Sequence, residues 1–208
     1  MIAPRTGRWR DGPSMSTKRS GHCSALLGGV SVVCGGVWNG GALSSTLLLP
    51  AGDAVQWSHG CEMASARFHA GGAVVAAADA RAHRMLVVGG ADSNSRPLDS
   101  CELYDGAADR WSLQEARLSQ GMRCRAASIA GGSAVLAVQS DDYETNPCCA
   151  LLDVRSRSPC WQPMASAAIA RVGHAVASVG EFSVVMLGGE DARYRRTDTV
   201  QLYDGRAD

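Results

Sequence analysis

A short stretch in the middle of the chain recurs at its C-terminal end. Residues 103–109 read LYDGAAD and residues 202–208 read LYDGRAD, and the two stretches differ only at Ala107 and Arg206. Similarity at a fixed spacing indicates a repeat architecture, which restricts the possible folds more strongly than composition does. We therefore expect the chain to consist of several copies of one structural unit.

Other landmarks recur at the same spacing of about 50 residues. Tryptophans mark the units at Trp9, Trp57, Trp111 and Trp161. An arginine follows three of these tryptophans by ten residues, at Arg19, Arg67 and Arg171, and the nearest equivalent in the third unit is Arg123. Two glycines close a short apolar run at residues 35–36, 89–90 and 188–189, and we assign Ala137 and Val138 to their place in the third unit.

Each unit is predicted to form four β-strands. Valine-rich runs such as VSVV and SVVML are too short for helices, and they are typical of strands buried on both faces. The alternating stretches CELY and VQLY predict half-buried strands, and the Asp-Gly after each indicates a tight turn into the tryptophan-bearing strand. Four strands in every unit of about fifty residues predict the blades of a β-propeller.

The order of the landmarks, Arg-x-Gly-His, apolar run, Gly-Gly, Leu-Tyr-Asp and Trp, resembles the kelch motif over nearly the whole chain. The resemblance implies an all-β, kelch-type β-propeller with about four visible four-stranded blades. The first unit departs from the motif with LLLPAGDAVQW in place of Leu-Tyr-Asp, and the second has Phe-His after its arginine. Within residues 1–208 the predicted pieces are an outer tryptophan strand (1–13), repeat 1 (14–57), repeat 2 (58–111), repeat 3 (112–161) and repeat 4 without its tryptophan strand (162–208).

The two ends of the chain are complementary, and this leaves two arrangements open. The segment ending in Trp9 resembles the outer strand that repeat 4 lacks, so it could close a small four-bladed ring. Alternatively, the four units form an arc of a larger propeller. The arc exposes apolar blade faces, and it therefore predicts self-association.

Composition argues against several classes of partner and site. Twenty basic residues balance twenty acidic residues, so a nucleic-acid or membrane-surface partner is not expected. We find no signal peptide and no apolar segment long enough to span a membrane, and we expect a cytoplasmic protein whose eight cysteines stay reduced. The cysteines and histidines lack metal-ligand spacing, and no cofactor or metal is expected.

Candidate binding residues fall into two groups. The resemblance implies that Arg19, Arg67, Arg123 and Arg171 surround the central mouth, where guanidinium groups would bind carboxylates of an acidic or phosphorylated peptide. The structural alternative is that each arginine donates hydrogen bonds to carbonyls of its blade or pairs with an Asp or Glu on the next loop. The second group lies in the polar loops after the di-glycines and comprises Arg96, Arg193, Tyr194 and Arg195, with Arg196 beside them.

The preferred function is a non-catalytic protein-interaction module, of the kind that serves as a scaffold or substrate receptor. The resemblance also leaves open a propeller enzyme of the copper oxidase or sugar isomerase type and an actin-binding protein. For a copper site the supply of tyrosines is small, because only Tyr143 and Tyr194 lie outside the repeat positions. His22 and His174 occupy the same repeat position, and we expect them to stabilise the blade through hydrogen bonds. The resemblance further implies that many family members join the propeller to a BTB domain and act as substrate receptors. Residues 1–208 leave no room for such a domain, so we expect that role only if the natural protein is longer.

Overall fold

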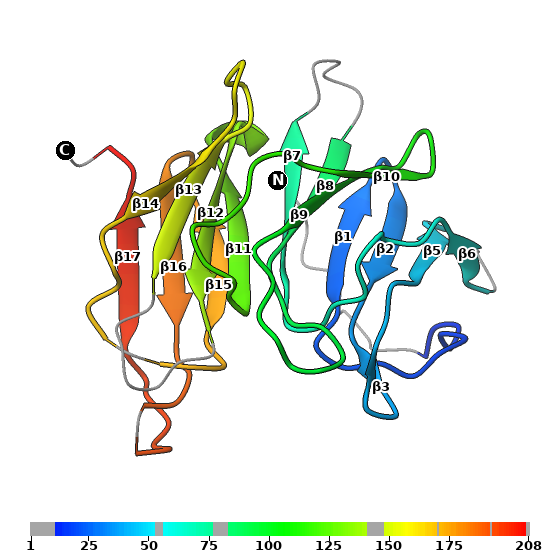
Figure 1. Ribbon diagram of the computed structural model, residues 1–208, viewed down its shortest axis with the longest axis horizontal. Coiled ribbons are helices and arrows are strands. Elements are labelled where there is room, and N and C mark those ends of the chain that lie inside the picture. The colour runs from blue at the N-terminus through cyan, green and yellow to red at the C-terminus, as the bar shows by residue number, and fades with distance from the viewer. Residues whose placement is uncertain are drawn as a thin grey trace, which may run out of the picture.

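The structure is a computed structural model, and it describes residues 11–52, 56–76, 83–140, 148–169, 171–191 and 193–206. These residues form four antiparallel sheets and one short two-stranded ribbon (Figure 1). The only helical element in the described part is a single 3-10 turn, η1 (Ala130–Gly132). The all-β prediction is confirmed.

Each sheet is formed by strands that are consecutive in the chain, apart from an inserted ribbon in the first sheet. The first sheet contains β1 (Cys23–Leu27), β2 (Val30–Cys34), β5 (Thr46–Pro50) and β6 (Ser58–Gly60), and the ribbon contains β3 (Val37–Trp38) and β4 (Gly41–Ala42). The second sheet contains β7 (Gly71–Ala76), β8 (His83–Val88), β9 (Cys101–Asp105) and β10 (Arg110–Leu113). The third contains β11 (Cys124–Ile129), β12 (Ala134–Gln139), β13 (Cys149–Asp153) and β14 (Trp161–Met164). The fourth contains β15 (Ala175–Val179), β16 (Ser183–Leu187) and β17 (Val200–Asp204).

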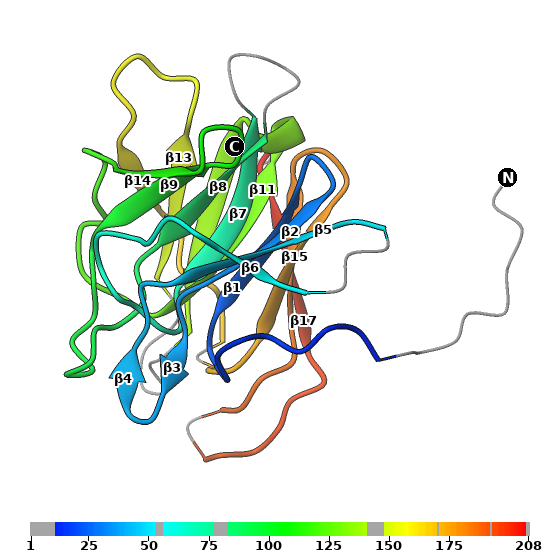
Figure 2. The same cartoon turned by 90° about the vertical axis from the view of Figure 1, so that its right-hand side faces the viewer.

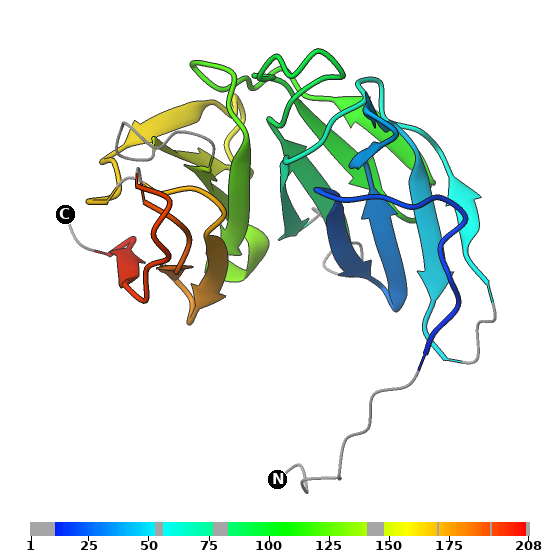
Figure 3. The same cartoon turned by 90° about the horizontal axis from the view of Figure 1, so that it is seen from below.

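The sheets are arranged around a common axis as the blades of a β-propeller (Figure 3). Their innermost strands contact one another in chain order, β1 with β7, β7 with β11 and β11 with β15. Three apolar clusters fill the spaces between consecutive sheets. The predicted four-bladed propeller is therefore confirmed, and the core lies between the blades rather than within any one of them.

One row of side chains has the same register in every blade, and in the first three blades it faces the next blade. An alanine on the innermost strand pairs with a valine or leucine on the second strand, which pairs with a leucine on the third. The rows are Ala25, Val32 and Leu48; Ala73, Leu86 and Leu103; Ala127, Leu136 and Leu151; and Ala177, Val185 and Leu202. The rows of the first three blades pack in the three apolar clusters.

The aromatic landmarks join neighbouring blades. The Trp111 and Tyr104 rings lie 4.9 Å apart between centroids, within the cluster between the first and second blades. Trp161 is buried against the second blade and donates from its indole nitrogen to the Cys101 sulfur at 3.3 Å. Trp9 lies outside the described residues, so its predicted outer strand stays a prediction.

The di-glycines are required because another backbone passes close by. A Cβ atom on Gly90 would lie 2.8 Å from the Phe68 carbonyl oxygen, and one on Gly189 would lie 2.7 Å from that of Val172. Both glycines also have positive φ angles, which side chains disfavour. The assignment of Ala137 and Val138 to these positions was wrong, because both lie inside β12, which continues to Gln139.

The fourth blade differs from the others in two ways. It has three strands among the described residues, so β17 is an edge strand. Its face directed away from the third blade carries the exposed side chains Val179, Leu187, Val200 and Leu202. The arc predicts such exposure, but the segment ending in Trp9, which would close a ring, lies outside the described residues, so both arrangements stay predictions.

All eight cysteines lie within the described residues, and none of them forms a disulfide. The part of the chain that the structure describes has no helix of the length and hydropathy needed to cross a bilayer.

Candidate functional site

Loops that follow the di-glycines meet at one end of the propeller. The β3–β4 ribbon and the loop between β16 and β17 both project there (Figures 1 and 2). The Ala42 amide in the ribbon donates to the Ser93 hydroxyl in the loop of the second blade at 2.9 Å. We call this end the mouth.

Two of the mouth loops have the same internal structure. The Asp92 carboxylate accepts hydrogen bonds from the backbone amides of Asn94 and Arg96, at 2.8 and 2.9 Å. The Asp191 carboxylate accepts them in the same way from Arg193 and Arg195, at 2.9 and 3.0 Å. These amides and the Arg195 guanidinium stabilise the charged carboxylate, and they lower the pKa of Asp191 to about 2.

Tyr194 and Ser95 occupy the same place in these two loops, and both have positive φ angles of 57° and 60°. The loop thereby presents the Tyr194 ring to solvent. Arg96, Arg193 and Arg195 are also exposed around the mouth. The Arg195 guanidinium lies 2.8 Å from the Asp191 carboxylate, so part of its charge is already neutralised.

Three of the four predicted mouth arginines bind carbonyls of their own blades. Arg19 donates to the Gly35 and Ser45 carbonyls at 2.9 and 3.2 Å. Arg171 donates to the Gly188 and Thr199 carbonyls, both at 3.0 Å. This geometry is the structural alternative that the sequence left open, and burial lowers the pKa of both guanidinium groups.

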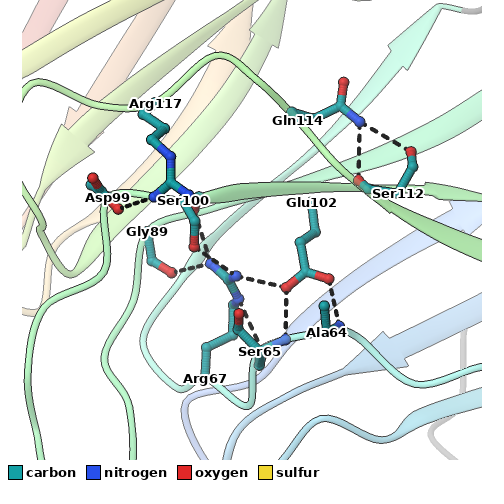
Figure 4. A network of polar contacts seen from close by, with 10 residues as sticks. All are labelled: Ala64, Ser65, Arg67, Gly89, Asp99, Ser100, Glu102, Ser112, Gln114 and Arg117. Carbon is teal, nitrogen blue, oxygen red and sulfur yellow. Dashed lines mark hydrogen bonds and ion pairs between the residues drawn. The ribbon is translucent and has the colours of Figure 1, made fainter.

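Arg67 makes the same contacts and adds a buried ion pair (Figure 4). It donates to the Gly89 and Ser100 carbonyls at 2.8 and 3.0 Å, and to the Glu102 carboxylate at 2.7 Å. The side chains of Arg67 and Glu102 are only 1% and 0% exposed. Glu102 also accepts from the amides of Ala64 and Ser65, so it ties the segment before the second blade to β9. Arg67 is therefore not available to a ligand.

Arg123 is placed differently from the other three. Its guanidinium carbon lies 5.3 Å from the centroid of the Phe68 ring, in a cation–π contact. The side chain is partly exposed and lines a cavity at the mouth. Of the four arginines that the sequence assigned to the mouth, Arg123 is the one found there with access to this cavity.

The cavity has a volume of about 710 Å³ and is lined by the second, third and fourth blades. Three basic side chains line it, namely Arg123, Arg125 and Arg196, and Glu190 is the carboxylate among its described lining residues. We call this cavity the arginine pocket. Arg196 is 92% exposed, and its Nε atom lies 3.9 Å from the Glu190 carboxylate, at the outer limit of an ion pair.

Sequence reasoning missed Arg125 entirely. The signal is the alternation Arg123-Cys124-Arg125, which runs from the residue before β11 into its first two residues, and in which Cys124 is buried and the two arginines are partly exposed. Because side chains alternate across a strand, both arginines lie on the same side of β11. His69 also lines the arginine pocket and was not predicted.

The histidines at the shared repeat position have different environments, and the expected hydrogen bonds were wrong for His174, because neither of its buried ring nitrogens has a hydrogen-bond partner among the described residues. His174 is buried with 1% exposure, whereas His22 is exposed. Burial lowers the pKa of His174 to about 4, and the charges of Arg125 and Arg171 act in the same direction. Among the residues that the structure describes, no three His, Cys, Asp or Glu side chains are grouped as they would be to hold a metal ion. Tyr143, considered for a copper site, lies outside them.

Comparisons with known proteins agree with the fold. No family model matches the chain. Human Kelch-like protein 34 is 29% identical over 214 residues, which cover 97% of this chain and 32% of that protein. The solved structure titled "Structure of YjhT" superposes with a TM-score of 0.71 at 14% identity, over 93% of this chain and 65% of that one. The chain thus spans about a third of Kelch-like protein 34 and less than two thirds of YjhT. By its structure and by these similarities, the chain is a four-bladed β-propeller with sequence similarity to Kelch-like protein 34.

Proposed function

We propose that this chain is a kelch-type protein-interaction module that binds an acidic or phosphorylated peptide in the arginine pocket. The observation that carries the proposal is the convergence of Arg123, Arg125 and Arg196 on one cavity with a single lining carboxylate among its described residues. The propeller fold and the similarity to Kelch-like protein 34 support a binding role of this kind. The proposed specificity for an anionic group rests on the lining of the arginine pocket.

The positions of the three arginines favour an anionic ligand. Guanidinium groups bind carboxylate and phosphate oxygens through paired, charge-assisted hydrogen bonds. The Phe68 ring holds Arg123 from one side, so less side-chain entropy is lost when a ligand binds. Among the described residues, the side chain of Arg196 has one charged contact, at 3.9 Å from Glu190, and it can turn toward a ligand.

The size of the cavity and the surrounding loops fit a short peptide. About 710 Å³ accommodates a few side chains, within the usual range of ligand sites. Tyr194, Arg193 and Arg96 are exposed on the loops at the mouth, where they would contact residues on either side of the bound acidic group. Tyrosine and arginine are the residue types that contribute most at such interfaces.

A peptide-binding experiment tests the proposal. An array of peptides containing Asp, Glu or phosphoserine is probed with the full chain, and the best peptide is titrated by fluorescence anisotropy. The double change Arg125→Ala with Arg196→Ala should raise Kd by more than about tenfold, because two charge-assisted contacts are lost. The affinity should also fall as salt is raised.

Arg157→Ala provides the matched control. Arg157 is an exposed arginine that lines a different cavity between the second and third blades, so its removal should leave Kd unchanged. If no acidic peptide binds, or if the double variant binds as tightly as the wild type, the proposal is wrong.

A further inference from the structure

The outward face of the fourth blade repeats a face that is buried in every other blade. In the second blade, the row Ala73, Leu86 and Leu103 packs against the third blade. The corresponding row in the fourth blade is Ala177, Val185 and Leu202, with the same cross-strand pairing. The adjacent row, Ala175, Leu187 and Val200, is likewise apolar.

Within the part of the chain that the structure describes, no segment buries these side chains. Val200 is 58% exposed and Leu187 is 38% exposed, whereas Cys101 and Val88, at the equivalent positions of the second blade, are both 0% exposed. The third row of the face contains Val179, Ser183 and Asp204, so the one carboxylate among the three rows lies at an edge. A continuous apolar face of this kind marks an interaction site.

The propeller itself shows what packs on such a face. In each covered case the neighbour is the opposite face of the next blade, which contributes branched and aromatic side chains. On the second blade, for example, Val74, Met85 and Tyr104 form the row that packs against the first blade. The same register in the first blade holds Leu26, Ser31 and Leu49. Leu26 is 62% exposed.

We propose that the fourth blade of one copy packs against the first blade of a second copy. The contact continues between two chains the interface that already joins consecutive blades within one chain. The contact joins two different surfaces and is therefore heterologous. In such an assembly every first blade and every fourth blade is covered only when the copies form a closed ring. Two copies of four blades would make one ring of eight, within the usual size of propellers.

The test is the mass of the full chain in solution as its concentration is raised, measured by light scattering after gel filtration. The wild type should change from one 21.7 kDa copy to two. The double change Val200→Glu with Leu202→Glu should weaken self-association by at least about tenfold, because it places charges in an apolar contact. Leu26→Glu should weaken it similarly from the other side.

Leu113→Glu is the matched control, because Leu113 is also an exposed leucine, at 53%, but lies outside the proposed contact. This variant should associate like the wild type. All four positions are exposed, so the variants should keep the wild-type circular dichroism and melting temperature when diluted to the monomer.

Three results would overturn the proposal. The first is a wild type that stays monomeric at all concentrations, which would also be the result if a segment of the same chain covered the fourth blade. The second is a fourth-blade variant that still associates. The third is a Leu26→Glu variant with unchanged association, because fourth blades would then pack against each other. None of these results affects the peptide site, which lies at the mouth.

Discussion

The second and fourth blades have the same strand register but different surroundings. In the second blade both faces are covered, and the Arg67–Glu102 ion pair is buried with them. In the fourth blade one face is exposed. The position equivalent to Glu102 holds Gln201, whose amide oxygen lies 3.4 Å from Arg171. The comparison shows that one strand pattern can build a core or a surface, depending on whether a neighbour is present.

Removing the ion pair should give the largest difference in unfolding free energy between equivalent variants of these two blades. Glu102→Ala would leave the Arg67 charge buried without its carboxylate, so we expect a loss of about 3–5 kcal/mol of unfolding free energy. Gln201→Ala removes one long hydrogen bond, from the Arg171 guanidinium to an uncharged amide oxygen, and should cost less than about 1 kcal/mol. Urea denaturation of both variants measures the difference. Equal losses of unfolding free energy would mean that the buried ion pair stabilises the second blade no more than the Gln201 contact stabilises the fourth.

Truncating a side chain of the apolar rows should give the next largest difference in unfolding free energy between the two blades. Leu86→Ala leaves a cavity between the second and third blades and should cost about 2–5 kcal/mol. Val185→Ala, at the equivalent position in the fourth blade, removes atoms from a partly exposed face and should cost about 1 kcal/mol or less. Denaturation is best measured at a concentration where the chain is monomeric. A Val185→Ala loss as large as that of Leu86→Ala would show that the fourth face is covered.

A smaller, pH-dependent difference should come from His174. The second blade has Ala70 at this repeat position, so His174→Ala makes the fourth blade resemble it. The folded-state pKa of about 4 lies below the ordinary value of 6.5, so folding favours the neutral ring. The stability that depends on a neutral His174 ring is fully present above pH 6.5, and it is lost as the pH falls toward 4.

The wild type should therefore lose roughly 2–3 kcal/mol more than the His174→Ala variant between pH 7.5 and 4.5. Denaturation at both pH values measures this loss. Subtracting the change in unfolding free energy of the variant from that of the wild type removes the contribution of the carboxylates that both proteins share. Parallel pH profiles would contradict a buried, neutral His174.

The repeated landmarks predicted much of this fold because each of them has a local cause. Di-glycines mark close backbone contacts, Asp-Gly marks the turn after Tyr104, and valine-rich runs mark second strands. The third unit was misaligned at Ala137 and Val138 because it lacks the di-glycine, and an apolar run by itself does not show where a strand ends. Whether an outer face is buried depends on whether another blade packs against it, and the local sequence of a blade does not indicate this.

The candidate site was less predictable than the fold. Arg19, Arg67 and Arg171 recur because each blade needs donors for its own carbonyls, and that role has the same spacing as a ring of ligand-binding residues would have. Arg123 was identified by its approximate spacing, but it reaches the pocket through its contact with Phe68. Arg125 and Arg196 do not repeat, so only the register of β11 and the shape of the last mouth loop bring them together.

Amide hydrogen exchange of the unmodified chain, read peptide by peptide, tests most directly whether equivalent strands differ in their surroundings. At a concentration where the chain is monomeric, β9 should exchange slowly, because it lies between β8 and β10 and both faces of its sheet are covered. By contrast, β17 should exchange much faster, because it is an edge strand on an exposed face. Equal protection of Cys101–Asp105 and Val200–Asp204 would contradict this account of the fourth blade.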